Sequence, residues 1–546
     1  MSQWRSRAFH LTRNREFIAK VALSILGIFA LMAAVLHVAT DTPTAKKEAL
    51  PRGWEALAEE TPAFKGGYDL LLKSRQPEPA RLAEWLMASD SLWKILQVAG
   101  QTAQSGNNPL VFADTDLPAL IKRHAVSEEQ RQAFTSYAEY RVGLNGAAKA
   151  TAQRELQRLA FATEPPRFAN TLLADLLRSD GRREEALKAL MREGRHAGAW
   201  EARLEAFDLA LDLKDAESVA LMSEDRELLD RLDPLSLWSA ARLTQDRRLL
   251  LEAMGRMQWQ RWMQSFAVPV ALLAAAIWYV VLVYSASRER LRWVRYLPAV
   301  MAGVVSVWLL HWMQGTLQYG SPDTVSAPSH THEMLDWILK VGLPEEVAKL
   351  VMFAFFLPVL LHRGSMTKAA LTAGIVGLGF ALDENLDYFT KDGPSAALPR
   401  LLGANFFHAA ATGILGCSLY ELFRSKFHRA TEFLTVFLGV VVAHGLYDFC
   451  FSTLMVEWEL EIMHVVILAV AARYYLRLLV APQEKPAGWV FSRTSVFTFG
   501  LALLIGVLMV IATWQLGSLK GITLTLQGAL GLAVIAYIYV REFNEV

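Results

Sequence analysis

Long apolar runs recur along the second half of the chain, and one more lies near its N-terminus at residues 17–39. Each run approaches the roughly twenty residues that a helix needs to cross the hydrocarbon core of a bilayer. The pattern predicts further spans near residues 264–285, 296–314, 335–361, 369–389, 401–422, 431–452, 457–478, 495–516 and 521–540. The expected fold class is therefore an all-α, polytopic membrane helical bundle of about ten spans.

Between the first two runs, residues 41–262 are polar, charged and rich in helix-forming residues. Residues 171–177, 179–182 and 184–193 are patterned in turn as a helix, a tight turn and a helix. Such hairpins are typical of stacked, solenoid-like arrays, although an irregular helical bundle fits the pattern equally well. We therefore expect an inserted α-helical domain outside the membrane.

Lysine and arginine collect in alternate loops between the predicted spans. They follow the second, fourth, sixth and eighth spans and include Arg288, Arg290, Arg292, Arg295, Arg363, Lys368, Arg424, Lys426, Arg429 and Arg473. Because basic loops stay in the cytoplasm, both termini are expected there and the 41–262 domain is expected on the other side. In a bacterium this arrangement describes a multi-pass protein of the inner (cell) membrane with an extracytoplasmic domain.

The composition supports a membrane protein and argues against two kinds of partner. Hydrophobic residues make up 53% of the chain and charged residues 20%, which is too apolar for one ordinary soluble fold. With 55 basic and 54 acidic residues the net charge is +1, so no basic field favours nucleic acid. The sequence has no glycine-rich phosphate-binding loop, so we expect no nucleotide cofactor. The lipid bilayer is the expected surrounding.

Four successive predicted spans carry ionisable side chains, although each charge inside a bilayer costs about 3 kcal/mol. They are Glu345, Glu346 and Lys349 in the fourth span, Glu384 in the fifth, His408 in the sixth, and His444 and Asp448 in the seventh. Such groups are retained when they pair, meet water or take part in chemistry. A purely structural role therefore competes with a functional one at each position.

The fourth span begins with features of a helix start inside the membrane. Pro344 suits the first turn of a helix, so Glu345 and Glu346 are expected at the N-terminus of a broken or re-entrant helix. Lys349 lies four residues after Glu345 and can share its face. A buried ion pair that only locks two helices together fits this spacing as well as a catalytic arrangement does.

The predicted topology places all of these groups in the outer half of the membrane, because adjacent spans run in opposite directions. A convergent set of carboxylates and imidazoles can activate a water molecule and stabilise an oxyanion. The same set suits a divalent metal ion such as zinc. Two further aspartates of the fifth span, Asp383 and Asp387, fall on other faces, where we expect them to be solvated or interfacial.

The order of these motifs resembles that of the PrsW family of intramembrane proteases, which is distantly similar to the type II CAAX prenyl endopeptidases. The resemblance rests on Glu345-Glu346-x-x-Lys349, Phe380-x-x-x-Glu384-Asn385-x-x-Tyr388, His408 and His444-x-x-x-Asp448, and it covers residues 296–452. It implies hydrolysis of a peptide bond within or beside the membrane. In the family's namesake this is the first cut of a membrane-bound anti-sigma factor.

The resemblance also implies roles for the matching residues. Either Glu345 or Glu346 would act as the general base, and His444 with Asp448 would polarise the scissile carbonyl. The implied catalytic residues are Glu345, Glu346, Glu384, His408, His444 and Asp448, supported by Lys349, Asn385 and Tyr388. The candidate metal ligands are Glu345, Glu384, His408 and His444. Activation of water by a metal ion and by a glutamate alone are both compatible with these motifs.

The patterns divide the chain into five parts with one expected function. The parts are a cytoplasmic N-terminus with an anchor helix (1–40), the extracytoplasmic helical domain (41–262), the second span with a cytoplasmic loop (263–295), the protease core (296–452) and additional C-terminal spans (453–546). The expected function is an intramembrane endopeptidase that acts on a membrane protein substrate. The alternatives are a catalytically silent scaffold or receptor and a cation- or proton-coupled transporter, for which we see no inverted repeats.

Overall fold

The computed structural model describes residues 3–40, 121–122, 125–142, 146–264, 266–286, 293–317, 330–453, 458–480, 491–516 and 518–543. All regular structure within these ranges is helical. This confirms the all-α prediction. The chain forms two compact units, one of residues Thr44–Leu249 and one that combines Met1–Pro43 with Leu250–Val546. Residues 41–120 of the predicted extracytoplasmic domain lie outside the described part.

The first unit consists of short helices that pack on their neighbours in sequence. They are α8 (Glu128–Val142), α9 (Gly146–Ala160), α10 (Ala169–Ser179), α11 (Arg183–Glu193), α12 (Trp200–Asp212), α13 (Ala216–Met222), α14 (Arg226–Arg231) and α15 (Pro234–Thr244). Helix α10 contacts α11, and α11 in turn contacts α12. The turn predicted at residues 179–182 contains Gly181 at φ 77°, a conformation that glycine adopts without strain.

Buried polar contacts tie the helices of this unit together. The Tyr137 hydroxyl donates to Asp175 at 2.5 Å, which joins α8 to α10. Glu193, at the end of α11, is buried and accepts hydrogen bonds from the backbone N–H groups of Phe168 and Asn170 at 2.6 and 3.1 Å. These two donors lie at the start of α10, where helical N–H groups lack partners within the helix. Burial raises the pKa of Glu193 above its usual value.

The second unit holds the helices that can cross a membrane. Within the described residues, eight helices are long and apolar enough, or nine if a bent pair counts as one span. The eight belong to α2 (Arg15–Thr40), α17 (Ala267–Ala286), α18 (Leu297–Leu317), α22 (Met366–Lys391), α24 (Ala404–Arg424), α25 (Ala430–Thr453), α26 (Trp458–Val480) and α27 (Arg493–Leu516). The bent pair is α28 (Lys520–Gly531) with α29 (Ala533–Phe543), at an angle of 52°.

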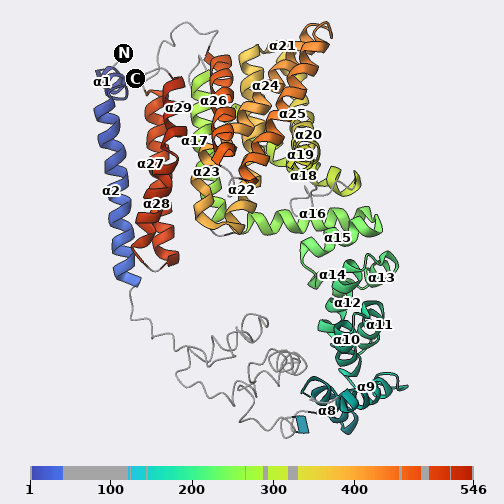
Figure 1. Cartoon of the computed structure of the whole chain (residues 1–546). Coiled ribbons are helices and arrows are strands. Elements are labelled where there is room, and N and C mark those ends of the chain that lie inside the picture. The colour runs from blue at the N-terminus through green and yellow to red at the C-terminus, as the bar shows by residue number, and fades with distance from the viewer. Residues whose placement is uncertain are drawn as a thin grey trace. The chain divides into compact units, whose positions relative to one another are not determined.

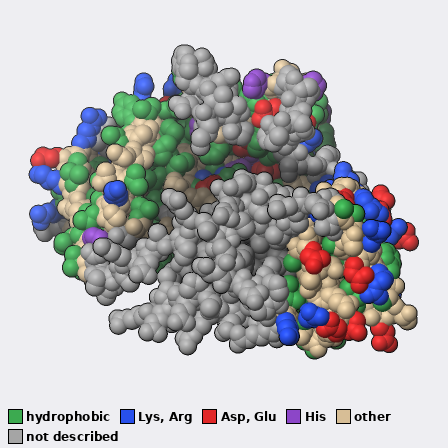
Figure 2. All heavy atoms as spheres, turned by 60° about the horizontal axis from the view of Figure 1, so that its bottom comes forward, with side chains coloured by type: hydrophobic (Ala, Val, Ile, Leu, Met, Phe, Trp, Pro, Cys, Tyr) green, Lys and Arg blue, Asp and Glu red, His purple; other side chains and the backbone are tan. Residues whose placement is uncertain are grey.

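The surface of this second unit suits a lipid environment. Many apolar side chains are visible on the described surface of the membrane-spanning helices in Figure 2. Large apolar residues such as Leu23, Leu31 and Leu530 are exposed. Exposed apolar surface on this scale is expected where lipid replaces water. The chain is thus an integral, multi-pass membrane protein.

The predicted span at residues 335–361 is not one continuous helix. It consists of the end of α19 (His330–Asp336), a π-helical segment (Trp337–Gly342), α20 (Leu343–Ala354) and α21 (Leu357–Arg363). Pro344 and Pro358 lie in the first turns of α20 and α21. Proline lacks the N–H that would continue a helix, and it starts a new one readily. The break places Glu345 and Glu346 in the first turn of α20, as predicted.

Helix α22 packs on α17, α18 and α24, and its glycines allow close approach to two of them. A Cβ atom on Gly377 would lie 2.2 Å from the carbonyl oxygen of His408 in α24. One on Gly379 would lie 2.1 Å from the carbonyl oxygen of Val300 in α18. Small residues permit such backbone contacts between membrane helices. This close packing brings Glu384 of α22 beside α24.

Segments far apart in the sequence meet at the end of the unit that carries both chain termini. Helix α2 packs along α27, and α1 (Gln3–Leu11) lies near the C-terminus in Figure 1. The Ser492 hydroxyl donates to the carbonyl oxygen of Thr12, and Arg493 donates to that of Phe543 at 3.0 Å. The first and last helices of the chain are thus tied to the start of α27.

Candidate active site

The first turn of α20 carries two buried carboxylates and their shared cation. Glu346 and Lys349 are fully buried, and Glu345 is only 7% exposed. The Lys349 ammonium donates to Glu345 at 3.2 Å and to Glu346 at 2.9 Å. It also lies 4.0 Å from the centre of the Phe380 ring, a favourable cation–π distance. The ion pair predicted from the spacing therefore exists, as part of a larger cluster.

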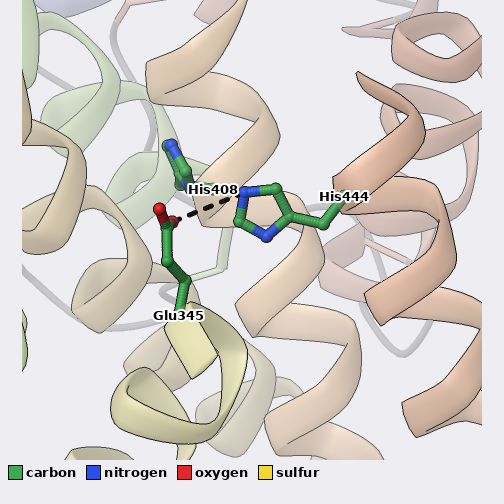
Figure 3. A group of neighbouring side chains, drawn as sticks. All are labelled: Glu345, His408 and His444. Atoms are coloured by element: carbon green, nitrogen blue, oxygen red, sulfur yellow. Dashed lines mark ion pairs between the residues drawn. The ribbon is translucent and has the colours of Figure 1, made fainter. Parts of the chain in front are cut away.

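His444 of α25 joins this cluster through both ring nitrogens. Its Nδ1 lies 2.8 Å from Glu346 Oε1 and, because a carboxylate only accepts, Nδ1 carries the proton. Its Nε2 lies 3.5 Å from Glu345 Oε2 and 3.3 Å from Asp448 Oδ2. Figure 3 shows Glu345, His408 and His444 converging from three helices, with the Glu345–His444 contact dashed.

His408 of α24 connects α20 to α22. Its Nδ1 lies 2.9 Å from Lys349 Nζ, and its Nε2 lies 3.0 Å from Glu384 Oε2. Because the lysine ammonium only donates, Nδ1 accepts and Nε2 carries the proton that faces Glu384. The imidazole has a contact at each ring nitrogen, so it links Glu384 to Lys349 and through it to Glu345 and Glu346.

Arg400, which the sequence analysis missed, holds Glu384 and Asn385 in place. It is buried in α23 (Ala397–Leu402) and donates to Glu384 from Nη2 at 2.6 Å and to Asn385 from Nε. Its guanidinium lies 3.8 Å from the centre of the Tyr388 ring. Arginines at the edge of an apolar run commonly extend to the membrane surface, so the sequence gives no sign that Arg400 belongs to the site. Its burial in the folded structure is what distinguishes it from such arginines.

Two other polar contacts also escaped the sequence analysis. The Thr412 hydroxyl lies 3.3 Å from Glu346 Oε2, and Asn385 donates to Asn405 at 2.7 Å. Thr412 and Asn405 are buried residues of α24. Neutral side chains of this kind carry no signal within an apolar run. They complete the hydrogen bonding of groups that the motifs did identify.

The structure brings together all nine residues predicted for the site. Glu345, Glu346, Lys349, Glu384, Asn385, Tyr388, His408, His444 and Asp448 form one connected network.

Asp383 and Asp387 were expected to be solvated or interfacial. For Asp383 the solvated alternative is wrong, because that side chain is fully buried, and Asp387 is 30% exposed within an ion pair. The reason is α16 (Arg247–Trp262), whose polar side chains cover this turn of α22 and supply donors.

The donor set fits a divalent metal ion. Glu345, His408 and His444 each offer one ligand atom, and these atoms lie within 4.8 Å of one another. Nε2 of His444 has no hydrogen-bond partner within the described residues, and the carboxylates of Glu345 and Asp448 lie close to it. A cation bound there would offset their negative charge. One carboxylate and two imidazoles suit zinc and leave a coordination position open. Glu384, a predicted ligand, is outside this group of three.

Part of the chain matches a known protein family. Residues 290–475 match the family model described as PrsW family intramembrane metalloprotease. The matched segment includes every residue of the site described above. No curated protein and no solved structure matches the chain. Residues 290–475 are therefore similar to the PrsW family intramembrane metalloproteases, and this match identifies the chain as a membrane-embedded peptidase.

Proposed function

We propose that the chain cuts a membrane protein substrate at the centre formed by Glu345, Glu346, Glu384, His408, His444 and Asp448. The observation that carries the proposal is the meeting of buried carboxylates and imidazoles from α20, α22, α24 and α25 in one network. A substrate of the anti-sigma-factor kind, held in the membrane and cut to release a signal, fits this location. Regulated proteolysis of a signalling protein is therefore the role we infer.

The contacts favour Glu345 over Glu346 as the residue that works on the attacking water. Glu346 accepts from Lys349 and His444 on Oε1 and from Thr412 on Oε2, so both of its oxygens are engaged. Glu345 has the longer lysine contact, at 3.2 Å, and retains a small exposed fraction. A general base must reach the water whose proton it takes. We assign that contact to Glu345, and we assign to Glu346 the orientation of His444.

The remaining residues place the reacting groups. His444, held by Glu346 and close to Asp448, is suited to polarise the scissile carbonyl. Glu384 and Arg400 hold His408 from the other side. A divalent ion held by Glu345, His408 and His444 would supply Lewis acidity and a more acidic water. Because both nitrogens of His408 already have contacts, it would exchange one of them to bind the ion.

The alternation of basic loops between the spans predicts where the chain is located. We infer a bacterial inner membrane, with both termini in the cytoplasm and the helices of residues 125–249 on the other side. The contacts of Thr12 with Ser492 and of Arg493 with Phe543 support a common side for the termini. Labelling of single cysteines at both ends and in α12 with a membrane-impermeant reagent tests this. Labelling of α12 alone in intact cells is expected, and labelling of a terminus contradicts the assignment.

The test of the function compares the membrane proteomes of four strains. They carry the wild-type chain, no chain, the Glu345→Ala/Glu346→Ala variant, or Glu421→Ala, a carboxylate of α24 outside the site. We expect at least one membrane protein to accumulate at full length in the null strain and the double variant but not in the control. If the double variant behaves as wild type, the carboxylates are structural and a silent scaffold becomes the better account.

A further inference from the structure

A second buried carboxylate lies next to the candidate site but is not part of it. Asp383, the residue before Glu384, is fully buried. Neighbouring residues of a helix point about 100° apart, so the two carboxylates leave α22 on different faces. Asp383 accepts hydrogen bonds from the Gln258 side-chain amide and from the Trp262 indole, the latter at 2.7 Å. Both donors belong to α16, more than a hundred residues away in the sequence.

Arg261 of α16 strengthens the same junction. Its Nη1 lies 3.7 Å from Asp383 Oδ2, and its Nη2 lies 2.6 Å from Asp387 Oδ2, one turn further along α22. Its Nη1 also lies 3.1 Å from His311 Nε2 in α18. Residues 258, 261 and 262 share one face of a helix because they are three and four positions apart. That face of α16 is therefore fixed on one turn of α22, and also on α18.

The packing of α22 explains why such a junction matters for Glu384. Its close contacts with α18 and α24 are made by Gly379 and Gly377, which present no side chain to interlock with the neighbouring helix. Such a face sets how close two helices lie, but it leaves rotation and sliding less well defined. Directional hydrogen bonds to a buried carboxylate supply the missing constraint. On the side of α22 that faces α16, Asp383 receives two such bonds, from Gln258 and Trp262.

We propose that Asp383 is a positioning residue for catalysis: held by Gln258, Arg261 and Trp262, it fixes α22 so that Glu384 lies between His408 and Arg400. The proposal rests on the proposed function, in which Glu384 belongs to the reacting centre. Glu384 has contacts of 3.0 Å to His408 and 2.6 Å to Arg400 that a small rotation of α22 would break. Small displacements of a catalytic group can lower the rate of the catalysed reaction strongly.

The experiment compares five full-length proteins in lipid nanodiscs: wild type, Asp383→Ala, Asp383→Asn, Trp262→Phe and Glu252→Gln. Asp383→Asn keeps an acceptor oxygen, and Trp262→Phe removes one donor while keeping an aromatic ring. Glu252→Gln is the matched control, because it breaks an ion pair with Arg256 that lies wholly within α16. The probe is a single-span peptide with a fluorophore and a quencher. Hydrogen exchange of residues 380–391 and 400–412 is measured on the same samples.

We expect kcat to fall on the order of 100-fold for Asp383→Ala and roughly 10-fold for Asp383→Asn and Trp262→Phe, with KM unchanged. Exchange should rise in both segments for these variants, and Glu252→Gln should match wild type. Faster hydrogen exchange with unchanged kcat overturns the positioning role of Asp383. Unchanged hydrogen exchange overturns the claim that the contacts of Asp383 with α16 fix α22. If the wild-type chain cuts no probe, the proposed function fails, while the two exchange segments still decide whether Asp383 fixes α22 and the region around His408.

Discussion

The two compact units of the chain differ in where many of their charged contacts lie. In the unit of short helices, pairs such as Arg158 with Glu155 and Arg182 with Glu185 join residues three positions apart on exposed helix surfaces. In the membrane unit the contacts at the candidate site and beside α16 include buried ones that join different helices, as between Glu346 and His444 or Arg261 and Asp383. Exposed ion pairs contribute little to the free energy of unfolding. Removing one partner of a buried ion pair destabilises the fold strongly, because it leaves an uncompensated charge in the interior.

The difference shows where the sequence places its chemistry. A local pair on a solvated helix can be lost without moving another element. A contact between α20 and α25, or between α16 and α22, determines where two helices lie relative to each other. The membrane unit therefore concentrates its polar side chains at the points where geometry has to be defined, and the candidate site is the largest of these points.

The largest effect on stability is expected from Lys349→Met. This change leaves Glu345 and Glu346 without their shared cation in a fully buried place. Breaking a buried ion pair on one side typically destabilises a protein by about 3–5 kcal/mol. The measurement is the thermal unfolding temperature in detergent, together with cleavage of the fluorogenic probe. Near-normal stability of this variant would contradict the view that Lys349 neutralises the two carboxylates.

A smaller effect, confined to catalysis, is expected from Arg400→Lys. Lysine keeps the positive charge but cannot donate to Glu384 and Asn385 at once in the planar arrangement that arginine uses. We expect kcat to fall roughly 10- to 100-fold with little change in KM or unfolding temperature. Arg424→Lys, at the exposed end of α24, is the control. An equal loss of activity in the control would mean that the loss does not come from the hydrogen bonds of Arg400 to Glu384 and Asn385.

The unit of short helices should respond to pH through Glu193. The folded pKa of this group is raised by burial, so the folded form binds the proton more tightly than the unfolded form. Stability from this group is present at low pH and is lost as the pH rises from the ordinary value through the raised one. Hydrogen exchange of α10 and α11 at about pH 5 and about pH 8 measures it. Glu193→Gln should reduce the pH dependence, and an unchanged profile would contradict the assignment.

The smallest effect is expected at the exposed pairs of the same unit. Glu155→Gln removes the partner of Arg158 on a solvated surface. We expect no measurable change in unfolding temperature and none in cleavage of the probe. A clear loss of stability would weaken the contrast between the two units, because it would show that local surface pairs also define structure here.

The sequence allowed prediction of features that depend on local spacing. Apolar runs predicted the spans, Pro344 predicted the helix break before Glu345, and the four-residue spacing of Glu345 and Lys349 predicted that they share a face. Each of these depends on residues that are close together in the chain. Helical periodicity is enough to relate them.

Contacts between distant segments could not be predicted in this way. Arg400 reaches Glu384 only because α23 folds back beside α22, and Gln258 reaches Asp383 across 125 positions. Asp383 was expected to be solvated or interfacial, and its own helix gives no sign that α16 covers it. The position of a covering helix depends on tertiary packing, which a single sequence does not display.

Cleavage by purified protein in proteoliposomes decides whether the buried carboxylates of α20 are catalytic. The substrate is the membrane protein identified by the proteome comparison, and the proteins are wild type, Glu345→Gln and Glu421→Gln. We expect wild type and Glu421→Gln to cut the substrate at the same site, and Glu345→Gln to be slower by on the order of 10²- to 10⁴-fold. Cleavage by Glu345→Gln at the wild-type rate would contradict the claim that this buried carboxylate works on the attacking water.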